Sequence, residues 1–96
     1  GLFRLLSDPT RLNLLMLLVD GEQNVTALCE SLKLPQPTVS HHLGLMRMNN
    51  VLSHRRMGKQ VFYSLNDRVG LVSADAIEIN TGLFGVRIVR TPQMSV

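Results

Sequence analysis

Apolar side chains recur at helical spacing through the first half of the chain and predict helices there. A short apolar group at residues 2–6 indicates the end of one amphipathic helix. Asp8 and Pro9 are typical of the start of the next helix. An N-cap carboxylate accepts hydrogen bonds from free backbone N–H groups, and a proline in the first turn lacks an N–H that would have no partner within the helix. We expect this helix to run to about Asp20, with Gly21 as a left-handed stop.

Two further helices are predicted over residues 24–32 and 36–49. Asn24 is a favourable N-cap for the first, and Pro37 is tolerated in the first turn of the second. Helical spacing predicts a buried apolar face made of Val25, Leu28, Leu32, Val39, Leu43 and Met46. Two short helices joined by a tight turn, the second with small hydrogen-bonding side chains in its first turns, are typical of a helix-turn-helix.

A β-hairpin with a basic tip is predicted next, over residues 51–57 and 60–65 around Gly58-Lys59. Apolar positions alternate in its second strand, so that one face can rest on the helices while the turn projects outwards as a wing.

The last thirty residues favour a second hairpin. Residues 69–76 fit either a weak helix or a loop, whereas residues 76–79 and 84–90 alternate as strands do. The predicted fold class is therefore α+β and mainly helical. It comprises a winged helix-turn-helix DNA-binding domain over residues 1–66 and a C-terminal extension over residues 67–96, packed on the same domain or on a dimer partner.

Charge is distributed unevenly along the chain and favours a polyanionic partner. Residues 31–66 contain five basic residues, no acidic residue and all three histidines, whereas residues 1–30 contain two basic and four acidic residues. Double-stranded DNA is the partner that such a surface favours, and a merely solvated basic face is the alternative.

Composition excludes several other classes of protein. The apolar run at residues 14–19 is too short to span a membrane, and no signal peptide opens the chain, so we expect a soluble cytoplasmic protein. Cys29 is the single cysteine, which is too few for a disulfide or a typical zinc site, and we expect no metal or other cofactor. We find no catalytic constellation and expect no enzyme. A short chain without a disulfide or a structural metal often needs a partner subunit for stability, which favours a homo-oligomer.

Three motifs in order carry a resemblance to a known family. They read Leu-Ser-Asp-Pro-Thr-Arg-Leu at residues 6–12, Gln-Pro-Thr-Val-Ser-His-His-Leu at residues 36–43 and Arg-Met-Gly-Lys-Gln-Val-Phe-Tyr at residues 56–63. Over residues 3–65 the chain resembles the ArsR/SmtB family of winged-helix repressors. The resemblance implies a homodimeric DNA-binding transcriptional regulator, often one released from its operator by a metal ion or another chemical signal.

The metal-sensing positions of that family are different in this chain. Asn24 and Thr26 stand where related sensors carry a Cys-x-Cys pair, and residues 67–96 contain no histidine for a C-terminal zinc or nickel site. We interpret Cys29 as a small core residue. The sequence thus predicts no metal site and identifies no inducer.

The candidate DNA contacts divide into two groups. We expect base contacts from the short polar side chains of the recognition helix, namely Gln36, Thr38, Ser40 and His41. We expect contacts to the DNA backbone from Arg47, Arg55, Arg56, Lys59 and Gln60. Helix capping and plain solubility are the structural alternatives for these groups. His42 is expected to hydrogen-bond the backbone at the edge of the core, and Asp8 to Arg11 to serve structure alone.

The sequence therefore predicts a sequence-specific, double-stranded DNA-binding transcriptional repressor that acts as a homodimer on a pseudo-palindromic operator. A winged-helix module that binds another protein by strand addition is the alternative. The absence of acidic residues from 31–66 favours DNA.

Overall fold

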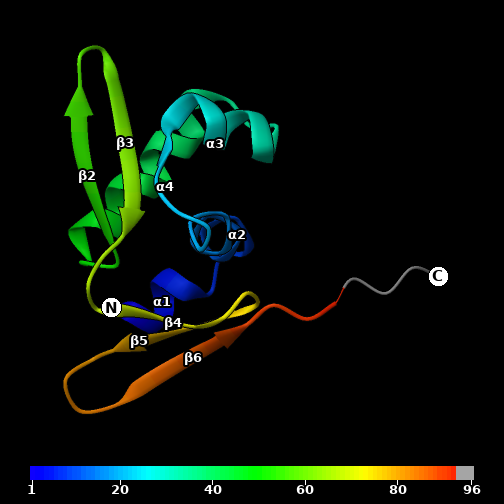
Figure 1. Cartoon of the computed structure of the whole chain (residues 1–96), viewed down its shortest axis with the longest axis vertical. Coiled ribbons are helices and arrows are strands. Elements are labelled where there is room, and N and C mark those ends of the chain that lie inside the picture. Colours follow the sequence, from blue (N-terminus) through cyan, green and yellow to red (C-terminus); the bar gives the residue numbers. More distant parts are fainter. Residues whose placement is uncertain (93–96) are drawn as a thin grey trace.

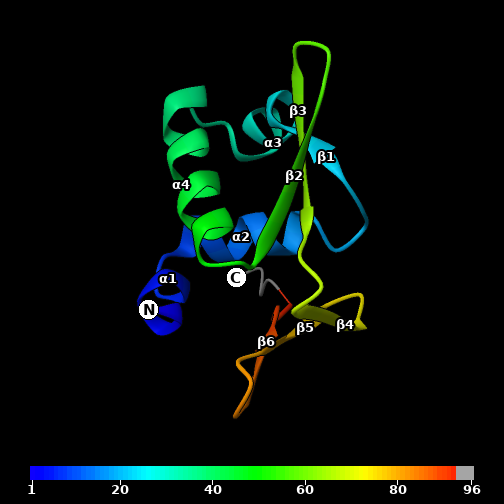
Figure 2. The same ribbon diagram turned by 90° about the vertical axis from the view of Figure 1, so that its left-hand side faces the viewer.

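The helices of the first half of the chain pack against a wing hairpin and a second small sheet, which lies at the opposite end of the molecule from the wing turn (Figures 1 and 2). This arrangement is that of a computed structural model, which describes residues 1–92; residues 93–96 of the predicted extension lie outside the described residues. The elements are α1 (Leu2–Leu6), α2 (Pro9–Leu17), β1 (Gln23–Asn24), α3 (Val25–Leu32), α4 (Gln36–Met48), β2 (Leu52–Met57), β3 (Gln60–Leu65), β4 (Val69–Ser73), β5 (Ala76–Asn80) and β6 (Gly85–Val89). Over residues 1–92, none of these helices has the length and apolar character needed to cross a membrane.

Helix α2 begins as predicted but ends earlier. The Asp8 carboxylate accepts hydrogen bonds from the backbone N–H groups of Thr10 at 2.8 Å and Arg11 at 3.1 Å. The helix stops at Leu17 rather than near residue 20, and the Gln23 amide donates to the Leu17 carbonyl at 2.7 Å. The predicted stop at residue 21 is wrong, since that glycine has a φ of +132° and lies in the following turn.

The predicted helix-turn-helix is confirmed in α3 and α4. Asn24 caps α3 by accepting a hydrogen bond from the Ala27 N–H at 2.7 Å. Lys33 ends α3 in the left-handed conformation, with a φ of 56°. The turn then leads through Pro35 into α4, whose inner face is fully buried at Val39, Leu43 and Met46.

The wing is a three-stranded sheet in the order β1-β3-β2. Strands β2 and β3 form the predicted hairpin, and buried Tyr63 lies on the face of β3 that packs on the helices. Strand β1 is a two-residue strand that the sequence pattern does not reveal. Its pairs, Gln23 with Tyr63 and Asn24 with Phe62, join the segment before α3 to the wing.

The C-terminal extension forms a second antiparallel sheet in the order β4-β5-β6. The predicted hairpin is confirmed as β5 and β6, but the expectation of a weak helix or loop at residues 69–76 is wrong. Val69 pairs with Ile79 and Leu71 pairs with Ile77, and a register shift follows before Ser73. A partner distant in the sequence thus decides the conformation of a segment whose own pattern is ambiguous.

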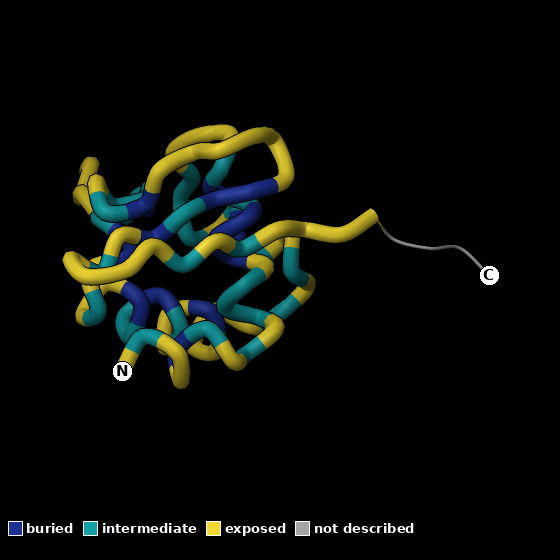
Figure 3. Tube along the Cα trace, turned by 90° about the horizontal axis from the view of Figure 1, so that it is seen from below, coloured by how far each residue is buried: buried dark blue, intermediate teal, exposed yellow. Residues whose placement is uncertain are grey.

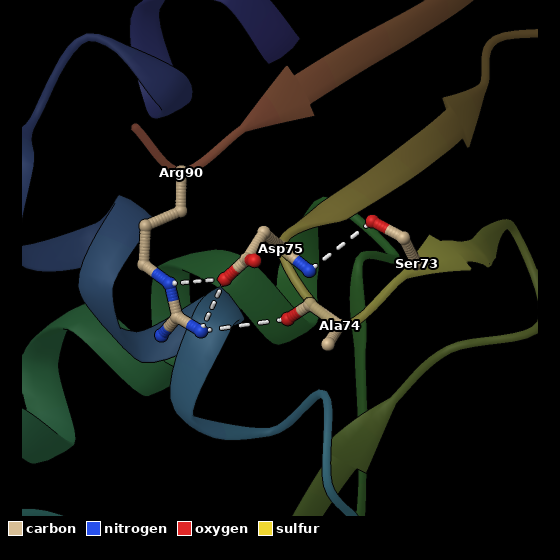
Figure 4. A network of polar contacts seen from close by, with 4 residues as sticks. All are labelled: Ser73, Ala74, Asp75 and Arg90. Atoms are coloured by element: carbon tan, nitrogen blue, oxygen red, sulfur yellow. Dashed lines mark hydrogen bonds and ion pairs between the residues drawn. The ribbon is translucent and has the colours of Figure 1, made fainter. Parts of the chain in front are cut away.

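Polar contacts join the end of β6 to the β4–β5 turn (Figure 4). The Arg90 guanidinium donates to one Asp75 carboxylate oxygen, from Nη2 at 2.8 Å and Nε at 3.1 Å, and to the Ala74 carbonyl at 3.4 Å. The Asp75 N–H donates to the Ser73 hydroxyl at 3.2 Å. These contacts lie just beyond the last pair of β5 and β6, Ala76 with Val89.

One hydrophobic cluster joins the helices to both sheets. It includes Leu5 of α1, Leu14 of α2, Leu28 of α3, Tyr63 of β3 and Ile77 of β5. Figure 3 shows the outer strand β6 alternating between exposed and half-buried positions, while the buried stretches lie inside. The extension is therefore part of the same core as the helix-turn-helix.

The shared core predicts that β5 contributes to the stability of the whole chain. Ile77→Ala, at a side chain that is 0% exposed, is expected to lower the free energy of unfolding by about 2–5 kcal/mol. Leu83→Ala, at a side chain that is 87% exposed, should change it by no more than about 0.5 kcal/mol. Urea denaturation followed by circular dichroism measures both. A negligible change for Ile77→Ala, or a separate transition for the sheet, contradicts a shared core.

Candidate nucleic-acid interface

The first turns of α4 and the turn between β2 and β3 lie at the same end of the molecule (Figure 2). Strand β2 begins just after α4 ends and runs antiparallel to it, back toward the end of the molecule where α4 begins. This brings the wing turn level with the start of α4. All nine candidate contact residues, on α4 and on the wing, are exposed. The structure thus brings the candidate base-contacting helix and the candidate backbone-contacting turn onto one end.

The outer face of α4 is polar and has two sides. Helical geometry, at about 100° per residue, places Gln36, Ser40 and Arg47 along one side and Thr38 and His41 along the other. Gln36, Thr38, Ser40 and His41 are all exposed. The polar side chains of the first turns of α4 are therefore accessible to a partner.

Sequence reasoning missed the centre of this face. Gly44 lies between the two sides, and a Cβ built at this position meets nothing within 4 Å apart from its chain neighbours and the backbone of its own helix. Met48 lies one turn further on and is 73% exposed. A glycine at the middle of a contacting helix leaves room for the close approach of a base edge or a phosphate.

The two neighbouring arginines of β2 lie on opposite faces of the wing. Arg56 pairs with Val61, on the face that also carries buried Tyr63, whereas Arg55 pairs with Phe62 on the other face. Alternation along a strand causes this separation. Lys59 lies in the turn itself, where all side chains are exposed. Arg56 and Lys59 are the exposed basic groups nearest the tip, and neither forms an ion pair within residues 1–92.

Arg55 already has an acidic partner. Its Nη2 and Nε donate to the two Glu22 carboxylate oxygens at 2.6 and 2.7 Å. The hydrogen bond from Arg55 holds the pKa of the Glu22 carboxyl below its usual value, and the same bond raises the pKa of the Arg55 guanidinium. The guanidinium also lies over the Phe62 ring, 5.0 Å from its centroid. This candidate backbone contact is therefore occupied within the chain.

Arg11 connects α2 to α1 and to the recognition helix. Its Nε donates to the Leu5 carbonyl at 2.7 Å, its Nη2 donates to the Arg4 carbonyl at 3.4 Å, and its Nη1 lies 3.3 Å from Nδ1 of His42. Because a guanidinium only donates, this contact requires a neutral His42 whose Nδ1 accepts. The expectation that His42 bonds the backbone is wrong, and Arg11 does more than support the start of α2.

The remaining candidate ligands are dispersed. His54 stacks on Tyr63, with ring centroids 5.8 Å apart and an interplanar angle of 26°. Cys29 is half-buried against the hydrophobic cluster. Over residues 1–92, no three His, Cys, Asp or Glu side chains lie close enough together to hold a metal ion.

Comparison with known proteins places this arrangement in a family. The family described as "Bacterial regulatory protein, arsR family" matches residues 8–52, which run from the N-cap of α2 to the start of β2. The transcriptional repressor SdpR of Bacillus subtilis is 37% identical over 69 residues, which cover 72% of this chain and 77% of SdpR. This chain belongs to the arsR family of bacterial regulatory proteins. The family consists of transcriptional regulators and not of enzymes.

Solved structures confirm the fold of this ArsR-family chain. HlyU from Vibrio cholerae superposes with a TM-score of 0.66 at 32% identity, over 69% of this chain and 70% of that protein. A homodimeric winged helix-turn-helix DNA-binding domain from Mycobacterium bovis gives a TM-score of 0.62 at 27% identity, over 65% of this chain and 57% of that one. The winged helix-turn-helix predicted from the sequence is confirmed.

Titration of the α2 cap gives a pH-dependent prediction for this ArsR-family chain. Backbone hydrogen bonds from Arg11 and Thr10, and the charge of Arg11, hold the pKa of the Asp8 carboxyl below its usual value of 3.8. Because the folded pKa is depressed, this stabilisation is present above the unfolded pKa and is lost as pH falls through the folded one.

Asp8→Asn keeps a capping oxygen and removes this titration. We expect the variant and the wild type to be similarly stable at about pH 6, and the wild type to lose more stability than the variant between about pH 4 and pH 2. Urea denaturation at each pH measures the difference. The same pH dependence in both proteins contradicts the assigned role of Asp8.

Proposed function

We propose that this chain is a transcriptional repressor that binds a pseudo-palindromic double-stranded DNA site as a homodimer, through residues 1–66. The observation that carries the proposal is the exposed polar face of α4 beside the wing turn, within a stretch from residue 31 to residue 66 that has no acidic residue. A polyanion meets no carboxylate from this stretch, which is what a DNA-facing surface requires.

The outer face of α4 supplies the proposed base contacts. The major groove of B-DNA admits a helix and presents a distinct pattern of donors and acceptors for each base pair. Gln36 has the amide that pairs bidentately with adenine, and Thr38, Ser40 and His41 are short or planar groups that reach base edges or phosphates. Gly44 allows the helix to enter the groove closely.

The wing and the end of α4 supply the proposed backbone contacts. Arg56, Lys59 and Gln60 surround the exposed wing turn, and Arg47 lies on the outer face of α4. Such contacts fix orientation on the duplex and supply salt-dependent affinity without reading sequence. The winged helix thus separates base recognition, on α4, from backbone attraction, on the wing.

Two-fold symmetry sets the arrangement of the site. In a homodimer, two recognition helices enter successive major grooves, so the half-sites should lie about one helical turn, or about 34–36 Å, apart. The homodimeric state of the related domain from Mycobacterium bovis supports this stoichiometry. The proposal places the protein in the cytoplasm with DNA as its partner and requires no cofactor.

A fluorescence-anisotropy titration tests the proposal. A duplex selected from a random pool is compared with its scrambled counterpart across a salt series, with and without zinc, nickel and cadmium. Tight, salt-dependent binding that prefers the selected duplex and is unaffected by the metals supports a sequence-specific regulator whose signal is not a metal. Release by a metal contradicts the expectation of no metal site. Shallow salt dependence without a preference for the selected duplex contradicts the proposal and favours a winged-helix module that binds another protein.

The division between α4 and the wing predicts different effects of substitution. Arg56→Gln combined with Lys59→Gln should weaken binding to both duplexes and flatten the slope of log affinity against log salt by about 3.6 for the homodimer, since each of its four lost phosphate contacts accounts for about 0.9. Gln36→Ala should keep that slope and reduce discrimination between the duplexes by about 1–3 kcal/mol.

Arg87→Gln is the matched control for these variants. Arg87 is an exposed arginine on β6, in the sheet that lies at the other end of the molecule, and its Nη2 pairs with Glu78 at 3.0 Å. Its substitution should change neither the slope of log affinity against log salt nor the preference for the selected duplex. Equal effects of the wing and α4 substitutions on slope and on preference contradict the division of roles.

A further inference from the structure

The wing sheet contains, two residue pairs from its terminal pair of Met57 with Gln60, a bidentate ion pair that the proposed DNA contacts do not use. Glu22 is the last residue before β1, and both of its carboxylate oxygens accept hydrogen bonds from Arg55 of β2. The Arg55 side chain is 51% exposed and that of Glu22 is 31% exposed, so the pair is accessible to solvent. Glu22 is also a carboxylate from outside the acid-free stretch that reaches the wing.

The pair spans the whole width of the wing sheet. Arg55 pairs with Phe62 on the central strand, and Phe62 pairs in turn with Asn24 on β1. The Arg55 guanidinium lies over the Phe62 ring on its way to Glu22, and its Nη1 donates to the Met57 sulfur at 3.6 Å. One side chain therefore connects the outer strand, the central strand and the segment that enters β1.

That segment leads directly into the helix-turn-helix. Asn24 ends β1 and caps α3, and α3 is followed by a short turn and the recognition helix. A connection between Glu22 and Arg55 therefore limits how far the wing can tilt relative to α3 and α4. The backbone pairs of β1 provide only two residues of ladder for this purpose, which is short for a strand.

We infer that Glu22 and Arg55 are positioning residues for DNA binding, which hold the wing at a fixed orientation relative to the recognition helix, and that Arg55 is not a phosphate contact. The inference rests on the proposed function. Its physical basis is preorganisation: a wing already held in its bound orientation loses less conformational freedom when the duplex binds. It assigns to Arg55 a role different from that of Arg56, its neighbour on the opposite face.

The two roles open to Arg55 predict opposite effects of neutralising its partner. If the pair positions the wing, Glu22→Gln and Arg55→Gln should each weaken binding by about two- to fivefold, as expected for an exposed ion pair, and the double variant should be no weaker than either. The slope of log affinity against log salt should stay unchanged. If Arg55 instead contacts a phosphate, Arg55→Gln should flatten the slope by about 1.8, one contact in each protomer of the homodimer, and Glu22→Gln should tighten binding by freeing the arginine.

Asp20→Asn is the matched control. Asp20 is an exposed acid two residues before Glu22 and forms no ion pair within residues 1–92. The substitution removes one negative charge from the same segment between α2 and β1, so it reports the general electrostatic effect of that charge on DNA binding. Subtracting that effect isolates the contribution of the pair, and we expect Asp20→Asn to tighten binding slightly where Glu22→Gln weakens it.

A measurement without DNA keeps the inference testable by itself. Hydrogen exchange of the amides of β1 and β3 should accelerate in Glu22→Gln and in Arg55→Gln but not in Asp20→Asn, while circular dichroism of all variants stays that of the wild type. Unchanged exchange, or tighter binding by Glu22→Gln than by Asp20→Asn, overturns the positioning role and leaves the proposed function intact. A wild-type protein that binds no duplex overturns the proposed function, and with it this inference.

Discussion

The pairing of β1 with β3 is the constraint on which the candidate interface depends. Gln23 and Asn24 pair with the central strand of the wing, and the next residue begins α3. The same two residues also satisfy helix ends, since Gln23 donates to the last carbonyl of α2 and Asn24 caps α3. Without this pairing the wing and the helix-turn-helix would be joined only by the short link that follows α4 and by the packing of side chains such as Tyr63 on the helices. With it, α4 and the wing turn stay at one end of the molecule.

The distribution of charge on the surface follows from this geometry. The stretch without acidic residues folds into α4 and the wing, so the charge pattern of the sequence becomes a surface in space. Glu22 is the exception, because β1 brings this carboxylate beside the wing, where Arg55 neutralises it. The basic side chains of this stretch that remain for a polyanion are Lys33, Arg47, Arg56 and Lys59, all of which are exposed.

Local signals in the sequence predict much of the fold, and distant partners decide the rest. Caps and apolar periodicity predict α2, α3 and α4, and the alternation in β3 predicts which face of the wing is buried. Strand β4 was missed because only its pairing with β5 makes it a strand. The candidate contacts on α4 follow from helical spacing, whereas the bond between Arg11 and His42 and the pair of Glu22 with Arg55 join residues more than thirty positions apart.

An amide chemical-shift titration of the isotope-labelled protein with a selected duplex locates the interface directly. If α4 and the wing form it, the largest shifts fall on the first three turns of α4 and on the wing turn between β2 and β3. The second sheet, β4 to β6, should show little change, because it lies at the other end of the molecule (Figure 1). Shifts concentrated on that sheet, with α4 unchanged, would contradict the claim that α4 and the wing form the nucleic-acid interface.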